Sequence, residues 1–311
     1  MTEAALIGVV TVTYNSGKDI ETFLSCAFGQ THARFILYCV ENASQDQTRQ
    51  LLESCKEERL RVILNDSNCG VAEGNNQGIR AALRDGCSLV LLINNDVTFE
   101  PNFIADLVAG MEHFHADMVC PKMLYFDPPH LIWAAGGTLQ PWLGYRSKHF
   151  GGEAVDDGSY DEPKRITYVP TCCVLMTRAT IDKVGLMDPL YFVYVDDTDF
   201  MYRAYKAGIF LMYLPSVRLM HKVGGATGGK GSPFTVRYCT RNRVYYLLKH
   251  LGLLRGLPFL LLYQAYFFFC FFLRNDKWPD LVYRQRSFFE GFEVYKRYKF
   301  QRSARIVSAS R

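Results

Sequence analysis

The sequence predicts an α/β fold with a mostly parallel central sheet and helices on both faces, on two observations. Up to about residue 125, short runs rich in Val, Ile and Leu alternate with amphipathic helical patterns. These runs are apolar throughout rather than at every second position, which is typical of strands buried on both faces of a parallel sheet. A chain of 311 residues has room for one large domain or two smaller ones.

The first part of the chain is expected to hold four strands and three helices in alternation. The strands are predicted at residues 6–13, 35–40, 60–64 and 89–93, and the helices at 19–28, 46–55 and 71–84. The carboxyl ends of parallel strands meet at one edge of a sheet, and ligands bind there. We therefore expect the functional side chains at the ends of these strands.

The second part is less regular. Residues 123–167 are rich in Gly, Pro and aromatic residues and predict loops with a small antiparallel insertion. A strand at 173–177 should then be followed by helices at 178–184 and 197–207. A strand pair, 210–213 and 217–221, and a Gly-rich loop at 224–231 come next. After Pro233 the pattern is helical to about residue 300.

Polar clusters follow all four of the first strands. They are Thr13-Tyr14-Asn15, Glu41-Asn42-Ala43-Ser44, the stretch 65–68 leading to Gly70 and Asn75, and Asn94-Asn95-Asp96. Any one of them is explained as a cap or turn, but four at successive strand ends predict one binding crevice. Neither GxGxxG nor a P-loop is present. Phosphate would therefore meet Asp96 through a divalent cation, which prefers carboxylate oxygen.

A second acidic cluster places Asp196, Asp197 and Asp199 within four residues. Acids are favourable at the start of a helix, but three carboxylates this close repel one another unless function or a cation offsets the repulsion. His221 follows at a predicted strand end, where structural and metal-binding roles are both open.

Several stretches together resemble glycosyltransferase family 2, the inverting enzymes of GT-A fold, and within it the rhamnosyltransferase-like branch. The resemblance covers nearly the whole chain to about residue 250. The matching stretches are VTYN (12–15), VENASQDQT (40–48), NCGVAEGNNQGI (68–79), LLINNDV (91–97), residues 185–208, VRLMHKVGG (217–225) and YCTRNRVYYLLKH (238–250).

The resemblance implies a domain plan and a role for each matching residue. A Rossmann-like GT-A domain would span 1–232, with a nucleotide-binding half (1–98) and an acceptor and catalytic half (99–232), followed by a helical, aromatic and basic extension (233–311). Asp197 would be the catalytic base with Asp196 beside it, and Asp96 and His221 would hold Mg²⁺ or Mn²⁺. Donor binding would fall to Thr13, Tyr14, Asn15, Glu41, Asn42, Asn68, Gly70, Asn75, Asn95 and Arg241.

Two departures from the family pattern stand out. Glu41 occupies the position where the family usually has Asp against the base, and Asn94-Asn95-Asp96 keeps only the last acid of the DxD motif. The implied reaction is a single metal-dependent displacement from a nucleotide-sugar to a hydroxyl of a lipid-linked or cell-surface glycan. The first candidate donor is dTDP-rhamnose, with UDP-galactofuranose or a UDP-hexose as alternatives. A non-catalytic scaffold subunit with the same fold is the rival interpretation.

The C-terminal third differs in composition from the rest. Sixteen aromatic residues lie between Leu251 and Phe300, and residues 274–311 carry ten basic and four acidic side chains. A buried helix, a homodimer contact and a helix at a bilayer surface are the alternatives, and aromatic residues flanked by cations favour the membrane surface. We expect a peripheral protein at the cytoplasmic face of the inner membrane with no signal peptide. The net charge of +4 gives no support to nucleic-acid binding.

Overall fold

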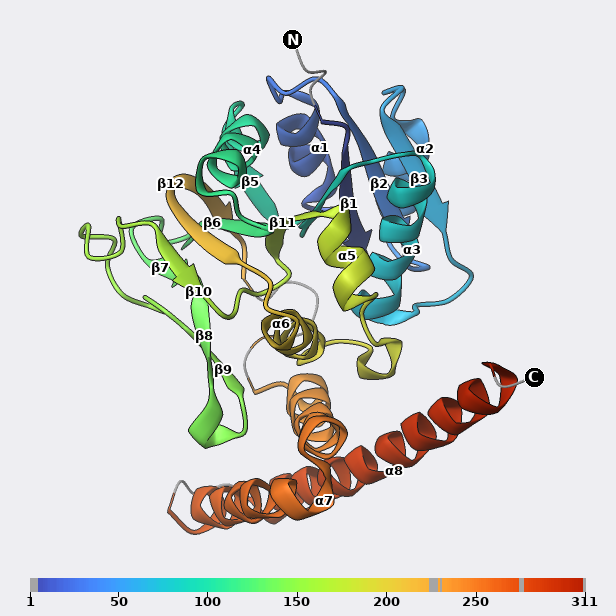
Figure 1. The fold of residues 1–311 in the computed structure, drawn as a ribbon, viewed down its shortest axis with the longest axis vertical. Coiled ribbons are helices and arrows are strands. Elements are labelled where there is room, and N and C mark those ends of the chain that lie inside the picture. The colour runs from blue at the N-terminus through green and yellow to red at the C-terminus, as the bar shows by residue number, and fades with distance from the viewer. Residues whose placement is uncertain (1–4, 224–228, 230, 274–276, 310–311) are drawn as a thin grey trace. The chain divides into compact units, whose positions relative to one another are not determined.

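The computed structural model describes residues 5–223, 229, 231–273 and 277–309 (Figure 1). Most of the Gly-rich loop predicted at 224–231 lies outside the described residues. The chain divides into two units. One holds residues 1–139, 147–192 and 196–226, and the other holds residues 140–146, 193–195 and 227–311. The domain limits predicted from the sequence stay a prediction.

The first unit begins with the predicted parallel sheet. Its strands run in the order β4-β1-β2-β3, and every neighbouring pair is parallel. Strands β1, β2 and β4 are almost wholly buried, as their apolar runs require. The elements are β1 (Ile7–Thr13), α1 (Ile20–Phe28), β2 (Phe35–Glu41), α2 (Thr48–Ser54), β3 (Leu60–Leu64), α3 (Gly70–Arg84) and β4 (Leu89–Ile93).

The same sheet continues beyond β4 to ten strands in all among the described residues. β11 is antiparallel to both β4 and β6, so β6 and its parallel neighbour β12 run in the same direction as β1–β4. Six of the ten strands thus share one direction, and the sheet is mostly parallel, as predicted. The additional elements are β5 (Val97–Phe99), α4 (Phe103–Phe114), β6 (Met118–Tyr125), β7 (Ile132–Ala134), β10 (Lys164–Ile166), β11 (Cys173–Thr177), α5 (Arg178–Val184), η2 (Pro189–Tyr191), α6 (Asp196–Lys206) and β12 (Leu211–His221).

Two sequence predictions about this region are wrong. The expected strand pair 210–213 and 217–221 is the single strand β12, whose register against β6 shifts between Leu214 and Arg218. The irregular region begins after Tyr125 rather than at Met123, because β6 is an interior strand. A lysine at position 122 argues against an interior strand in the sequence, but in the structure Lys122 is fully buried and paired with Asp156 and Asp161.

The predicted insertion is present between β6 and β10. Strands β8 (Gly137–Gln140) and β9 (Arg146–His149) form a separate two-stranded sheet, joined through the short helix η1 (Pro141–Leu143). Tyr168 forms an isolated bridge with Gly137, which attaches this insertion to the segment leading into β11.

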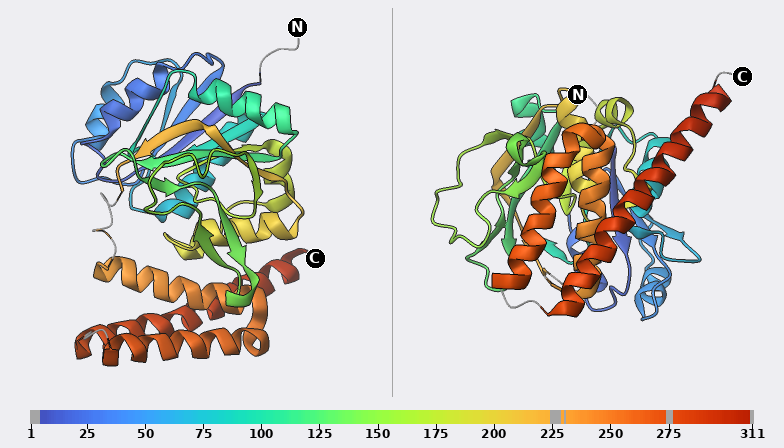
Figure 2. Two further views of the ribbon diagram at one scale, coloured as in Figure 1. Left: turned by 90° about the vertical axis from the view of Figure 1, so that its left-hand side faces the viewer. Right: turned by 90° about the horizontal axis from the view of Figure 1, so that it is seen from below.

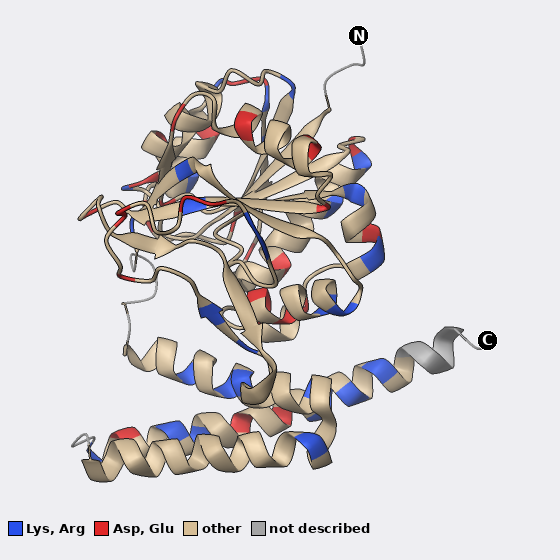
Figure 3. Cartoon of the chain, turned by 60° about the vertical axis from the view of Figure 1, so that its left-hand side comes forward, with Lys and Arg blue, Asp and Glu red and all other residues tan. Residues whose placement is uncertain are grey.

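The second unit consists mainly of α7 (Pro233–Leu273) and α8 (Trp278–Ala309). Gly252 has a φ of 71° inside α7, so the helix is interrupted there and its two parts differ in direction. α8 runs alongside the second part of α7 (Figure 2), where Phe288 packs against Tyr263 and Phe267. Lys and Arg recur along α8 (Figure 3).

Candidate active site

The loops after β1 and β2 hold each other at the edge of the parallel sheet. Asn15 has a left-handed backbone (φ 53°), its amide donates to Ser44 Oγ at 2.9 Å, and its Oδ1 accepts from the Gln45 amide at 2.8 Å. Thr13 is buried, and its hydroxyl donates to the Val40 carbonyl at 3.4 Å. The strand ends that carry these predicted donor-binding residues are therefore brought together, with Tyr14 half-buried between them.

Glu41 lies at the end of β2 with its side chain buried and turned toward its own loop. Its two carboxylate oxygens accept from the amides of Ala43, at 3.1 Å, and Ser44, at 2.7 Å. The Glu41 carboxylate thus holds the first turn of the loop that follows β2. Each oxygen keeps a second lone pair, and contact with a nucleotide base stays a prediction.

Asn42 and Asn68 both bind the backbone of Gly70, the first residue of α3. Asn42 Nδ2 donates to the Gly70 carbonyl at 3.3 Å, and the Gly70 amide donates to Asn68 Oδ1 at 2.9 Å. Gly70 has a φ of 83°, and a Cβ there would lie 2.5 Å from the Phe192 carbonyl oxygen. That carbonyl accepts from the Val71 amide at 2.6 Å. Only glycine fits at this junction.

Asn75 and Asn95 are buried, and the side-chain amide of each contacts another part of the protein. Asn95 Nδ2 donates to the Val12 carbonyl at 2.6 Å, and Asn75 Nδ2 makes a weak contact of 3.6 Å with Met187 Sδ. The neighbouring Asn76, which was not among the predicted site residues, binds both backbone groups of Met187. This pairing fastens α3 to the segment that leads toward the second acidic cluster.

The structure brings Asp96 and His221 together from β-strand ends that are distant in sequence. His221 Nε2 lies 3.2 Å from Asp96 Oδ1, and the Lys222 amide donates to the Asp96 carbonyl at 2.8 Å. Burial lowers the pKa of His221, but the neighbouring Cys172 and Asp96 outweigh it and raise that pKa to about 10. The two predicted metal ligands are therefore adjacent side chains.

The three acids at the start of α6 have three different environments. Asp199 is buried and structural, because it accepts from Tyr191 Oη at 3.0 Å and from Arg203 Nε at 2.9 Å. Asp196 is also buried, and burial together with the charge of Asp197 raises its pKa well above the ordinary value. Asp197 alone is partly exposed. Of the three, Asp197 is the carboxylate that can meet a ligand.

Tyr168 was not predicted, and it contacts Asp197 directly. Its hydroxyl donates to Asp197 Oδ2 at 2.6 Å, although the two residues are 29 positions apart in sequence. The ring lies 5.5 Å from that of His149, which in turn lies 5.3 Å from Trp133. Trp133 is 4.4 Å from His221. A row of rings thus connects the Asp197 carboxylate with the Asp96–His221 pair inside the first unit.

Residues 193–195, directly before Asp196, belong to the second unit and have an unusual backbone. Tyr194 and Val195 have φ values of 63° and 64°, and a β-branched residue with positive φ is a conformational outlier. Asn242, on α7, donates to the carbonyls of Val193, at 2.7 Å, and Tyr194, at 2.8 Å. Such strained backbone persists where surrounding contacts hold it. Asn242 is a further residue that the sequence prediction missed.

Arg241 also lies in the second unit, buried on α7. Its Nε donates to Asn242 Oδ1 at 2.8 Å, and its guanidinium stacks 4.5 Å from the ring centre of Tyr238. Burial lowers the pKa of this guanidinium. Its assignment to donor binding stays a prediction.

Part of the chain matches the sequence model of a known protein family. Residues 8–143 match the family model described as Glycosyl transferase family 2. Residues 8–143, which are under half of the chain, are thus similar to glycosyl transferase family 2. This confirms the resemblance found in the sequence motifs.

Two relatives within this family show how much of the chain is shared. Low-salt glycan biosynthesis hexosyltransferase Agl10 of Haloferax volcanii is 25% identical over 206 residues, which cover 65% of this chain and 62% of Agl10. The N-acetylglucosaminyl-diphospho-decaprenol L-rhamnosyltransferase of Mycobacterium tuberculosis is 25% identical over 243 residues, which cover 72% of this chain and 78% of that one. The chain thus matches less than two thirds of Agl10.

Solved structures show the same fold. Staphylococcus aureus TarS 1-349 in complex with UDP-GlcNAc has a TM-score of 0.58 at 16% identity, with 95% of this chain and 92% of that chain covered. The mannosyltransferase PcManGT from Pyrobaculum calidifontis in complex with GDP-Man and Mn²⁺ has a TM-score of 0.53 at 14% identity, with 99% and 80% covered. These likenesses confirm the predicted GT-A fold.

The Asp96–His221 pair could supply two ligands to a divalent cation, whose binding would displace the proton that the raised pKa keeps on the His221 ring. Asp96 Oδ1 and His221 Nδ1 are buried, and among the described residues neither makes a hydrogen bond, since the 3.2 Å approach of His221 Nε2 to Asp96 Oδ1 lacks hydrogen-bond geometry. The described part of the chain contains no group of three or more His, Cys, Asp or Glu side chains placed to hold a metal. A cation bound to this pair would therefore take its other ligands from phosphate oxygens and water, as Mg²⁺ commonly does.

Proposed function

We propose that this protein is an inverting hexosyltransferase that moves a sugar from a nucleotide-sugar to an acceptor hydroxyl. The observation that carries the proposal is the environment of Asp197. Asp197 is the partly exposed member of the acidic cluster, it accepts a hydrogen bond from Tyr168, and it belongs to the same unit as the Asp96–His221 pair. A base and a phosphate-binding centre are the two groups that this reaction needs.

In the proposed reaction Asp197 accepts the proton of the acceptor hydroxyl as that oxygen attacks the anomeric carbon. One displacement with one base inverts the anomeric centre. Asp96 and His221 would hold Mg²⁺ or Mn²⁺, which when bound neutralises the charge that develops on the leaving diphosphate. Asn15 and the loop held by Glu41 would bind the nucleoside at the strand ends.

The first candidate donor is dTDP-rhamnose. Two relatives support it: the Mycobacterium rhamnosyltransferase and the dTDP-rhamnosyl transferase RfbF of Shigella flexneri, which is 24% identical over 167 residues. UDP-galactofuranose and UDP-hexoses remain the alternatives. The acceptor would be a lipid-linked or cell-surface glycan, in line with the diphospho-decaprenol substrate in the name of the Mycobacterium relative.

The test is a screen of nucleotide-sugars for binding and turnover, with and without Mn²⁺, using polyprenyl-diphosphate-linked acceptors. Asp197→Asn should lose at least about a hundredfold in turnover while donor affinity changes little, because the base acts only on the acceptor. Asp182→Asn, on the exposed side of α5, is the matched control. A donor that binds the wild-type protein but is never transferred to any acceptor would support the scaffold interpretation instead.

We further propose that the second part of α7 attaches the protein to a membrane surface. Residues 256–273 contain no charged side chain, and α7 is long and apolar enough to cross a membrane by length and composition, with only 22% of its most apolar window buried. The part of α7 after Gly252 has 21 residues, about the length of a bilayer-spanning helix. A surface position is favoured instead by α8, which packs along α7 and carries charged side chains such as Arg286 and Glu293. Its exposed apolar side chains include Leu254, Leu257, Leu261, Leu262, Phe268, Phe269, Phe272 and Leu273.

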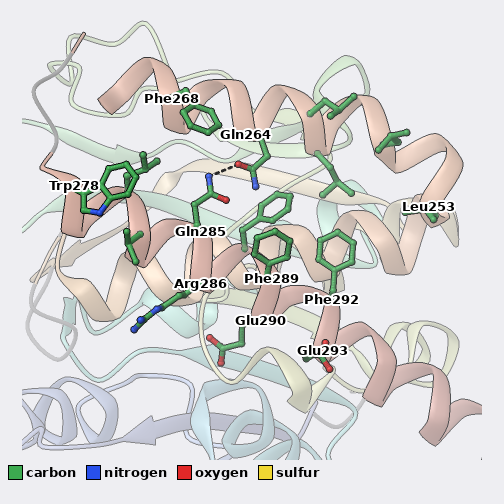
Figure 4. Close-up of a pocket in the computed structure, with 16 residues that line it drawn as sticks. Leu253, Gln264, Phe268, Trp278, Gln285, Arg286, Phe289, Glu290, Phe292 and Glu293 are labelled. Carbon is green, nitrogen blue, oxygen red and sulfur yellow. Dashed lines mark hydrogen bonds between the residues drawn. The ribbon is translucent and has the colours of Figure 1, made fainter. Parts of the chain in front are cut away.

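A groove between this part of α7 and α8 supports the membrane proposal. It has a volume of about 1050 Å³ and is lined mainly by apolar side chains, with Gln264 and Gln285 joined by a 2.6 Å hydrogen bond inside it (Figure 4). Leu261, Phe268 and Phe289 line the groove and are also exposed. Exposed cations near it, including Arg255, Lys277 and Arg286, suit anionic headgroups.

Flotation with vesicles of 30% anionic lipid tests this attachment. Leu261→Glu with Phe272→Glu should abolish flotation, whereas Leu64→Glu, at an exposed apolar site on β3, should leave it unchanged. Flotation of the double variant at the wild-type level would contradict the proposal. If the double variant instead turns a wild-type dimer into a monomer, these residues form the homodimer contact, which is the alternative.

A further inference from the structure

Tyr168 has a single polar contact with the proposed base, and nothing about its own sequence position suggests one. We propose that Tyr168 is a positioning residue for sugar transfer: its hydroxyl fixes the orientation of the Asp197 carboxylate toward the acceptor. The inference rests on the proposed function, because it assigns Tyr168 a role only if Asp197 is the base.

Hydrogen bonds restrain the Asp197 carboxylate but leave it able to accept one more. Tyr168 Oη donates to Oδ2 at 2.6 Å, and the Thr198 amide donates to Oδ1 at 2.5 Å. Each carboxylate oxygen accepts up to two hydrogen bonds, and the Thr198 hydroxyl also donates to Oδ1, at 3.2 Å. The acceptor hydroxyl therefore finds its lone pair on Oδ2. Without the Tyr168 contact only Thr198, which donates to Oδ1 from its amide and its hydroxyl, would restrain the broad χ2 torsion, and Oδ2 would lose its fixed direction.

Tyr168 itself is held firmly and stays protonated. Its side chain is 2% exposed, and burial first, then the charge of Asp197, raises the pKa of its hydroxyl well above the ordinary value. The hydroxyl therefore acts only as a donor toward the carboxylate. A donated hydrogen bond favours the charged form of its acceptor, so its loss is expected to show in the pH dependence of the reaction.

The insertion places the Tyr168 ring. The amide of Tyr168 lies 3.3 Å from the Gly137 carbonyl, and a Cβ on Gly137 would lie 2.8 Å from Tyr168 Cδ1. The ring packs at 5.5 Å from His149 on β9. The small β8–β9 sheet therefore orients the base through Tyr168, although it is distant in sequence from α6.

Tyr168→Phe tests the inference, with Tyr213→Phe as a matched control. Tyr213 is equally buried, and its hydroxyl donates to the Tyr160 carbonyl, at 3.0 Å, rather than to Asp197. The measurements are kcat and KM for donor and acceptor, the pH dependence of kcat/KM, and donor affinity by calorimetry. Unchanged donor affinity in both variants shows that both are folded.

Tyr168→Phe should lower kcat by about tenfold to a hundredfold, the range expected for a hydrogen bond to a charged group. The KM for the donor should stay within about twofold, and the acid limb of the pH profile should move to higher pH. Tyr213→Phe should change neither. Equal kcat values and equal pH profiles in the two variants would overturn the inference, whereas an inactive wild-type protein would overturn the proposed function instead.

Discussion

Gly70→Ala offers a test of how the strand-end loops and the segment before Asp196 depend on each other. Gly70 has a φ of 83°, and an alanine Cβ would lie 2.5 Å from the carbonyl oxygen and 2.8 Å from the Cα of Phe192. The left-handed backbone costs a non-glycine residue about 1–2 kcal/mol. Displacing Phe192 adds about 1–3 kcal/mol, as other overpacked sites do.

A glycine close to the other end of α3 serves as a control, because it has the same backbone φ and no steric clash. Gly86, just beyond the end of α3, has a φ of 84° and nothing within 4 Å of an added Cβ. Gly86→Ala should therefore cost only the backbone part, about 1–2 kcal/mol. The difference between the two variants isolates the steric contribution at Phe192.

Urea unfolding followed by circular dichroism measures both free energies of unfolding, and nucleotide-sugar turnover measures the functional effect. Gly70→Ala should lose more stability than Gly86→Ala by about 1–3 kcal/mol, and turnover should fall only in Gly70→Ala. Phe192 has to move in that variant, and it lies four residues before Asp196. Equal losses of stability in the two variants would refute the steric reasoning.

Three further predictions concern charged groups. Lys122→Met should cost about 1–3 kcal/mol in urea unfolding, because Asp156 and Asp161 lose a buried hydrogen-bond donor but keep Arg218 beside them. Lys296→Met, in an exposed pair, should cost less than about 1 kcal/mol. Asp96→Asn should weaken Mn²⁺-dependent donor binding at least about tenfold by calorimetry, and exposed Asp66→Asn should not. Asp196 has a raised pKa in the folded state, so its contribution to stability is complete below the unfolded pKa of about 4 and declines as pH rises. Asp196→Asn should therefore gain stability over the wild type from pH 5 to pH 8 without metal, by at most about 1.4 kcal/mol per pH unit, and parallel stability curves would contradict this.

The sequence by itself determined the parallel half of the sheet. The apolar runs of β1, β2, β3 and β4 and the helices between them lie where the pattern placed them, within one or two residues at each end. Burial on both faces of a strand is a local property that composition records directly. The polar clusters after these strands were predictable for the same reason, since strand order and direction bring their ends to one edge.

Contacts between distant segments were decided only by the tertiary structure. β6 was missed because Lys122 is tolerated in an interior strand only with Asp156 and Asp161 beside it, more than 30 residues away. Glu41 was predicted to face the ligand, but its carboxylate also binds its own loop. Tyr168 and Asn242 carry no sequence signal, because their importance lies in what they meet: Tyr168 the Asp197 carboxylate, and Asn242 the strained backbone of Val193 and Tyr194.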